Sequence, residues 1–190
     1  MTITDIFRKH NVDKHQDVSG GHPYGPTYEA ILNPVRDRVR SVLELGILWG
    51  SSLRAWREIF PGARVVGVDI NVPRADVNGA EMYQADATSA SELNAAIGES
   101  RFDLIVDDAS HWEHEQMASF GILRVRLNPG GIYVVEDIQW DNSHRKFEDL
   151  GFEVFDLRAE GDGYRHDNVL AVYRAPSSAG SGFADTCWYR

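Results

Sequence analysis

The chain has one cysteine, Cys187, among its 190 residues, and it has no long hydrophobic run. A single cysteine excludes an internal disulfide framework and is typical of a protein from a reducing compartment. No apolar run approaches the roughly 20 residues that a membrane-spanning helix needs. The first residues, Met1 to Asp5, also lack the basic and then apolar regions of a secretory signal. We therefore expect a cytoplasmic protein without membrane contact.

Basic charge is scarce as well. The chain carries 29 acidic against 19 basic residues, a formal net charge of -10. Proteins that bind nucleic acids normally show a basic footprint, so we expect no nucleic-acid partner. The apolar share of 43% and the charged share of 25% are those of an ordinary globular domain, and the length suffices for one sizeable core. A small-molecule substrate is the better expectation.

Short apolar runs of strand length alternate with helical segments from residue 41 onward. Such alternation is typical of βαβ units and predicts a parallel sheet. Two further apolar runs near the end have only a short link between them, which favours an antiparallel hairpin. The expected strands are 41–46, 64–69, 81–86, 102–107, 132–136, 152–156 and 168–173, and the expected helices are 51–59, 89–98, 112–126 and 143–150.

This pattern divides the chain into three parts. Residues 1–40 are expected to form a helical and irregular segment that packs on the core, and residues 41–175 to form the α/β domain. Residues 176–190 begin with a run of Pro, Ser and Gly, which is typical of a flexible linker, and end in an aromatic tail.

Two of the predicted strands end in carboxylates. Asp107 and Asp108 end one strand, and Glu136 and Asp137 follow the next. Because parallel strands end at one edge of the sheet, Asp108, Glu136 and Asp137 are expected to converge there. Three acidic oxygen donors suit Mg²⁺ or Mn²⁺, or Ca²⁺, whereas a softer metal becomes plausible if His111 is itself a ligand. An imidazole beside such a site is a natural proton acceptor, so His111 is the candidate base.

Side chains alternate along a strand, so only one member of the Asp107–Asp108 pair is expected to point into the metal site. If that residue is Asp108, then Asp107 faces a cofactor or caps the next helix.

The turn after the first strand carries the residues Glu44, Gly46, Gly50 and Ser51. Glycines at such a turn let the backbone approach a ligand closely, and the amides at a helix N-terminus can face a carboxylate or phosphate. The G-x-x-x-G spacing lacks the dinucleotide-binding fingerprint, and no phosphate-loop lysine follows it. Tight turns alone explain these glycines equally well.

Acids also end the second and third strands. Asp69 can accept both hydroxyls of an adenosine ribose, or it can cap the following loop. Asp86 can meet an adenine amino group, or it can cap the helix after it. Acids at three successive strand ends favour an adenosine pocket.

These motifs together resemble the class I S-adenosylmethionine-dependent methyltransferases, across about residues 40–175. The resemblance implies a Rossmann-like, seven-stranded, mostly parallel sheet with an antiparallel last strand and helices on both faces. It also implies that Gly46 and its neighbours contact the methionine part of the cofactor, Asp69 the ribose and Asp86 the adenine. The matching segments are Leu43 to Gly46, Val68 with Asp69, Asp86, Phe102 to Asp107, and Leu127 to Gly131.

A narrower resemblance is to metal-dependent O-methyltransferases that act on sugars of natural products, with relatives labelled cephalosporin hydroxylases. Asp108 to His111 is similar to that family's D-x-x-H element, and Glu136-Asp137 to its E-D pair. The resemblance selects Asp108 for the metal and implies Mg²⁺ or Mn²⁺, with a glycosylated small molecule as the acceptor. An element near the N-terminus is also similar to a motif of that family, and it comprises Asp13, Lys14, His22, Tyr24, Tyr28 and Glu29. Asn11-Val12 precedes it where the family usually has Gly-Thr.

Two alternatives remain open at this point. A catechol-type phenol O-methyltransferase shares the fold and metal, although those relatives tend to have an Asp-Asn pair and a lysine base. A non-catalytic cofactor-binding protein is the other alternative. The acceptor pocket is either open or completed by another subunit, so a homo-oligomer is possible. Candidate acceptor contacts, for which core or rim packing is an equal explanation, are His22, Tyr24, Trp112 and Trp140.

Overall fold

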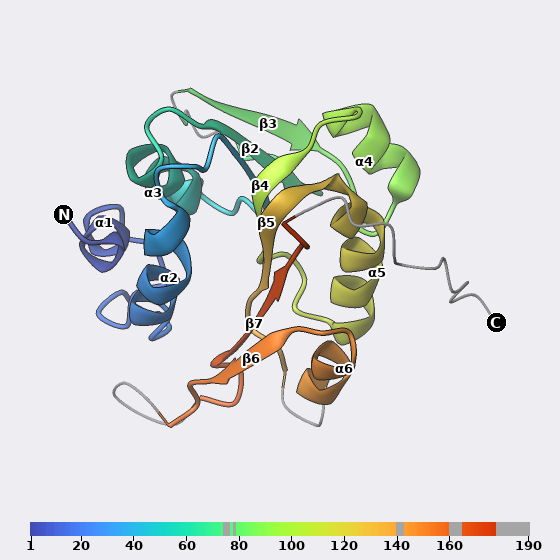
Figure 1. Ribbon diagram of the computed structural model, residues 1–190. Coiled ribbons are helices and arrows are strands. Elements are labelled where there is room, and N and C mark those ends of the chain that lie inside the picture. The colour runs from blue at the N-terminus through green and yellow to red at the C-terminus, as the bar shows by residue number, and fades with distance from the viewer. Residues whose placement is uncertain (74–76, 78, 140–142, 160–164, 178–190) are drawn as a thin grey trace.

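The computed structural model describes residues 1–73, 77, 79–139, 143–159 and 165–177, which form a sheet between two layers of helices (Figure 1). The sheet has seven strands in the order β3-β2-β1-β4-β5-β7-β6. The strands are β1 (Ser41–Leu45), β2 (Arg64–Asp69), β3 (Ala80–Gln84), β4 (Phe102–Asp107), β5 (Leu127–Val135), β6 (Glu153–Asp156) and β7 (Val169–Arg174).

Five strands from β3 to β5 pair in parallel, whereas β7 runs antiparallel to both of its neighbours, β5 and β6. This confirms the predicted sheet and its closing hairpin. The register pairs Asp107 of β4 with Val135 of β5, and the Glu136 amide donates to the Asp107 carbonyl at 3.0 Å. That register brings Asp108 beside Glu136 at one edge of the sheet.

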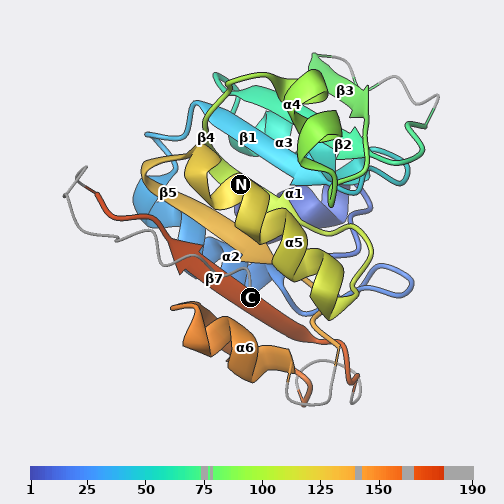
Figure 2. The same ribbon diagram turned by 90° about the vertical axis from the view of Figure 1, so that its right-hand side faces the viewer.

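Among the described residues, six α-helices cover the two faces of the sheet (Figures 1 and 2). One face packs on a buried cluster that includes Phe7, Tyr28 and Trp56, and the other on a cluster that includes Phe120 and Tyr133. Because both faces are covered, the central strands are almost continuously apolar. The first face carries α1 (Ile3–Lys9), α2 (Gly25–Leu32) and α3 (Ser51–Ile59), and the second α4 (Ala90–Ile97), α5 (Glu113–Leu123) and α6 (Ser143–Asp149).

Some predicted boundaries were wrong. The helix expected over 112–126 begins after Trp112 and ends at Leu123, and a 3₁₀ turn (Arg124–Arg126) follows it. Strand β5 begins at Leu127 rather than at residue 132, because Leu127 already pairs with Phe102. The pairing shifts register between Phe102 and Leu104, and this shift accommodates the Pro129-Gly130-Gly131 run. In the sequence, the same run indicates a break before the strand.

Within the described ranges, no helix is long and apolar enough to cross a membrane. The predicted tail from residue 178 and its Cys187 lie outside the described residues, and the proposed division into three parts stays a prediction.

Candidate functional site

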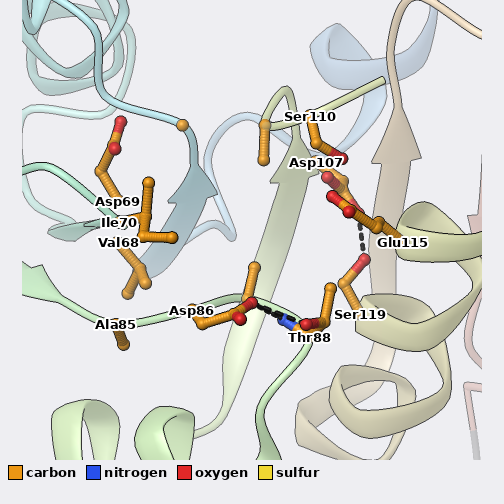
Figure 3. Close-up of a pocket in the computed structure, with 13 residues that line it drawn as sticks. Val68, Asp69, Ile70, Ala85, Asp86, Thr88, Asp107, Ser110, Glu115 and Ser119 are labelled. Carbon is orange, nitrogen blue, oxygen red and sulfur yellow. Dashed lines mark hydrogen bonds between the residues drawn. The ribbon is translucent and has the colours of Figure 1, made fainter. Parts of the chain in front are cut away.

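Two neighbouring clefts lie at the sheet edge where β1, β2 and β4 end. The first, of about 170 Å³, is lined by Asp69, Asp86 and residues of the β4–α5 loop (Figure 3). The second, of about 490 Å³, continues to Asp108 and His111. Both clefts are lined by Gly46, Asp69 and Ala109, so they adjoin, and together we call them the groove, from the end of β3 to the acidic residues after β4.

Asp69 stands in the wall of both clefts at the end of β2. One carboxylate oxygen accepts from the Ile47 amide at 2.7 Å, and the other accepts from the Asn71 amide at 2.8 Å. These bonds hold the carboxylate at the groove and tie it to the β1–α3 turn. The first oxygen, Oδ2, also accepts a longer bond from the Leu48 amide at 3.4 Å, whereas Oδ1 keeps a second acceptor position that a hydroxyl can use.

Asp86 lies in the first cleft, beyond the end of β3. Its Oδ1 accepts from the Thr88 amide at 2.8 Å and from the Thr88 hydroxyl at 2.7 Å (Figure 3). The N-cap of α4 is Ser89, whose hydroxyl accepts from the Glu92 amide. Asp86 therefore shapes the loop before the helix and does not cap it.

The β1–α3 turn depends on glycines for close packing. Gly46 has φ +86°, and a Cβ built there would lie 2.0 Å from the Asp108 carbonyl oxygen. Gly50 is the left-handed N-cap of α3 with φ +70°. Ser51, the first residue of the helix, lines the second cleft. The turn thus lies directly against the backbone of the β4–α5 loop.

We expect Gly46→Ala to destabilise the protein by about 1–3 kcal/mol, because alanine is strained at this φ and its Cβ meets backbone that cannot move aside. Denaturant unfolding measures the change. Gly121→Ala is the matched control: a Cβ at Gly121, inside α5, meets nothing within 4 Å, so alanine should leave stability unchanged or raise it by about 0.5–1 kcal/mol. Equal midpoints for the two variants would contradict this account of the turn.

Glu44 lies behind this turn and not in either cleft. Its side chain is fully buried, and its Oε2 accepts from the Ser52 hydroxyl at 2.6 Å. Its Oε1 lies 3.6 Å from the Lys14 ammonium. Burial raises the pKa of Glu44 to about 7, although Lys14 opposes the rise. The predicted cofactor contact of Glu44 stays a prediction.

Three groups that could bind a metal ion converge at the second cleft. Asp108, His111 and Asp137 each offer one ligand atom, and these atoms lie within 4.8 Å of one another. His111 Nε2 lies 3.1 Å from Asp108 Oδ1, and His111 Nδ1 lies 3.7 Å from Asp137 Oδ2. Two carboxylates and an imidazole at this spacing can hold a divalent cation.

Glu136 adjoins this group but its carboxylate is buried. Its Oε2 accepts from the Lys14 ammonium at 2.8 Å, and its Oε1 accepts a short hydrogen bond from the Tyr28 hydroxyl. The same Lys14 ammonium donates to Asp108 Oδ2 at 2.6 Å. The site therefore contains a lysine that sequence reasoning did not place there; the only signal was the Asp13-Lys14 element of the family resemblance.

The pKa values reflect this crowding of charge. Burial raises the pKa of Asp108, but Lys14 and His111 overcome that effect and lower it to about 2. Burial raises the pKa of Glu136 well above its ordinary value, with Lys14 opposing. Burial lowers the pKa of His111, but Asp108 and Asp137 outweigh it, so the net shift is upward. Asp108 therefore stays ionised beside Lys14 and His111, whereas burial favours the neutral form of Glu136.

Unusual backbone conformations gather at the same place. Among the described residues, the non-glycine residues with positive φ are Asn11, Leu48, His111 and Asp137. The first three line the second cleft, and Asp137 belongs to the acidic group. Non-glycine residues at positive φ are uncommon and cluster at functional sites.

His22 and Tyr24 lie behind Asp137. The Tyr24 hydroxyl donates to Asp137 Oδ1 at 2.6 Å, and His22 Nδ1 lies 3.3 Å from the same oxygen. The two rings stack at 4.9 Å and both are buried. This placement supports Asp137 from behind, and a contact of either residue with the acceptor stays a prediction.

The other predicted residues are distributed around the groove. Asp107 is buried, and its Oδ2 accepts from the hydroxyls of Ser119 and Tyr133 on the α5 side of the sheet, away from Lys14. Burial raises the pKa of Asp107 to about 6. Trp112, next to His111, is 64% exposed. Trp140 lies outside the described residues.

Comparison with known proteins found relatives, although no family model matches the chain. A tetracenomycin rhamnoside methyltransferase from Streptomyces olivaceus, 8-demethyl-8-alpha-L-rhamnosyl tetracenomycin-C 2'-O-methyltransferase, is 36% identical across 94% of this chain. Mycinamicin VI 2''-O-methyltransferase from Micromonospora griseorubida is 31% identical across 62% of it. The chain spans 48% of the length of the first relative, and its match covers 32% of the second.

A solved structure has the same fold. MycE, a methyltransferase of mycinamycin biosynthesis solved in complex with Mg, SAH and mycinamycin VI, superposes with a TM-score of 0.75 at 23% identity. The match covers 97% of this chain and 57% of MycE.

Proposed function

We propose that this protein methylates a hydroxyl of a sugar or glycosylated small molecule with the help of a divalent metal ion. It is a homologue of natural-product sugar O-methyltransferases and has the class I S-adenosylmethionine-dependent methyltransferase fold. One observation carries the proposal. The cleft with Asp69 and Asp86 adjoins the cleft of Asp108 and His111, which form a group of possible metal ligands with Asp137.

The first cleft fits S-adenosylmethionine. Carboxylates stand at the ends of β2 and β3, where the ribose and adenine of an adenosine would find acceptors. Gly46 lines both clefts, so the backbone of the β1–α3 turn can contact the methionine part. Asp107, buried at the floor of the cleft, supports Ser119 in its wall.

The acidic group fits a divalent cation. Asp108 and Asp137 provide oxygen donors, Glu136 is the third proposed ligand, and His111 lies within reach of the same point. Oxygen donors favour Mg²⁺ or Mn²⁺. When bound, the cation would lower the pKa of an acceptor hydroxyl and offset the carboxylate charge that raises the pKa of His111.

His111 takes the proton in the proposed reaction. As the acceptor oxygen bonds to the methyl carbon, the bond from that carbon to the sulfonium sulfur breaks, and the hydroxyl proton moves to a ring nitrogen of His111. Asp108, 3.1 Å from His111 Nε2, orients the ring and stabilises the imidazolium that forms. Tyr24 and His22 hold Asp137 in place from behind.

The acceptor enters through the second, larger cleft. That cleft contains Asp108 and His111, and its outer wall carries Leu48 and Trp49, which are 68% and 72% exposed. A sugar hydroxyl at His111 would place the rest of the glycoside along this wall. The expectation of a small-molecule acceptor rather than nucleic acid rests on the net charge of -10. A cytoplasmic location and a homo-oligomer also stay predictions.

The activity is tested by supplying S-adenosylmethionine with a labelled methyl group to panels of glycosides and catechols, with Mg²⁺ or with excess EDTA. We expect label to appear in a glycoside only with Mg²⁺. Transfer to catechols alone would instead support the phenol alternative, and full transfer in EDTA would exclude the metal mechanism.

We expect Asp69→Ala to weaken S-adenosylmethionine binding by roughly 10- to 150-fold, because hydrogen bonds to a charged partner contribute about 1.5–3 kcal/mol. Calorimetry of the wild type and variant measures the change. Asp156→Ala is the control, since Asp156 ends β6 and bonds to Arg158 outside both clefts. An unchanged dissociation constant for Asp69→Ala would argue against the ribose contact.

A further inference from the structure

Lys14 is a buried cation that the proposed reaction does not use. It lies in the segment between α1 and α2, and its side chain is 1% exposed. Its ammonium lies 2.6 Å from Asp108 Oδ2, 2.8 Å from Glu136 Oε2 and 3.6 Å from Glu44 Oε1. A lysine is rarely buried this completely unless its charge is paired.

Carboxyl groups outnumber permanent cations around Lys14. Within the described part of the chain, the ion pairs of the acidic cluster involve only Lys14, His22 and His111 as basic partners. Only Lys14 among these is a permanent cation near neutral pH, and it faces three carboxylates. The acidic cluster consists of Glu44, Asp108, Glu136 and Asp137, so four carboxyl groups share one permanent cation.

The carboxyl groups of this cluster form two sets, an inner set that faces Lys14 and an outer set that faces His111. In the inner set, Lys14 contacts Glu44 and Glu136, both of which are completely or almost completely buried. In the outer set, Asp108 turns Oδ2 to Lys14 and Oδ1 to His111, and Asp137 turns Oδ2 to His111. Asp108 and His111 line the second cleft, and Asp137 belongs to the same group of possible ligands.

We propose that Lys14 is a positioning residue that acts as a resident cation of the acidic cluster. It compensates the inner carboxylates, sets the orientation of Asp108 and thereby directs a divalent ion toward the outer oxygens of Asp108 and Asp137, with the adjoining Glu136 as its third proposed ligand. The part of this inference that concerns the ion rests on the proposed metal-dependent function, whereas the pairing of Lys14 with the inner carboxylates does not.

The same contact fixes one wall of the acceptor cleft. Asn11, Asp13 and Ser19, which flank Lys14 in sequence, line the second cleft. Lys14 joins this segment to residues 94 and 122 positions away in the chain. Lys14 therefore connects the wall of the cleft to the acidic cluster.

Unfolding of Lys14→Met and Lys14→Arg full-length protein, in EDTA and then with Mn²⁺, tests the proposal. In EDTA we expect the Tm of Lys14→Met to fall by about 10 °C, because buried carboxylates lose their partner, and that of Lys14→Arg to fall less. Added Mn²⁺ should raise the Tm of Lys14→Met more than that of the wild type, since it replaces the lost charge. Calorimetry should show Mn²⁺ binding at least about tenfold tighter in Lys14→Met.

A second pair of variants keeps the test decisive if Lys14→Met folds poorly. Glu44→Gln removes one inner charge, so Lys14→Met/Glu44→Gln should be more stable in EDTA than Lys14→Met alone, whereas Glu44→Gln by itself should not stabilise the wild type. Additive effects of the two substitutions would overturn the role of Lys14. Equal Mn²⁺ affinity in the wild type and Lys14→Met would overturn its effect on the ion. If neither protein binds Mn²⁺, the proposed metal dependence fails, while the Lys14–Glu44 comparison still decides the pairing.

Discussion

The His111→Ala variant is expected to lose turnover by about 10²–10⁴-fold, the usual contribution of a positioned proton acceptor. His111 lies at the groove, 3.1 Å from Asp108, and no other histidine of the described residues lines either cleft. Removal of the ring leaves the acceptor hydroxyl without its base but leaves the adenosine cleft intact. Steady-state kinetics at saturating acceptor, with calorimetry of S-adenosylmethionine, separate these effects.

His114→Ala is the matched control for this variant. His114 stands on α5 three positions further along, its side chain is 77% exposed, and its nearest acidic partner is Glu115 at 3.8 Å. The control should turn over at the wild-type rate. A wild-type rate for His111→Ala at saturating acceptor would remove it as the base.

The second large effect is expected for Asp108→Asn, which should reduce Mg²⁺-supported turnover to the level seen in EDTA. Asp108 contacts both Lys14 and His111 and is a proposed ligand, so the amide removes a negative charge that orders the site and attracts the ion. Binding of S-adenosylmethionine should change little, because Asp69 and Asp86 are unaltered. Turnover with and without Mg²⁺, and calorimetry with Mn²⁺, measure the change.

Glu113→Gln controls for loss of an acid from the segment that follows β4. Glu113 begins α5 and pairs with Lys146 at the surface. We expect its Mg²⁺-dependent turnover to equal that of the wild type. Mg²⁺-stimulated turnover that persists in Asp108→Asn would contradict the proposed ligand.

Much of this architecture was predictable because it depends on local periodicity. Strands β2 and β4 and helix α3 have the predicted bounds, since each is an apolar run or a helical repeat with clear ends. The rule that parallel strands end at one edge predicts that Asp108, Glu136 and Asp137 converge beside His111. The structure groups Asp108 and Asp137 with His111, whereas Glu136 pairs with Lys14. The side chains of Asp107 and Asp108 point to different partners, as alternation along a strand predicts.

The rest depended on contacts between distant segments. Lys14 reaches the acidic cluster from an irregular loop, and no periodicity in its neighbourhood indicates that destination. For the same reason, the sequence could not predict the burial of Glu136 against Tyr28 or the support of Asp137 by Tyr24. The early start of β5 was missed because glycine and proline usually end strands, whereas here the pairing continues past them.

The most direct test of the central claim is anomalous diffraction from crystals of the protein grown with S-adenosylhomocysteine and Mn²⁺. The account predicts the nucleoside in the cleft of Asp69 and Asp86, and one Mn²⁺ peak bound by oxygens of Asp108 and Asp137 beside His111. A nucleoside bound there with no Mn²⁺ peak at these carboxylates, or with the peak at another site, would contradict it.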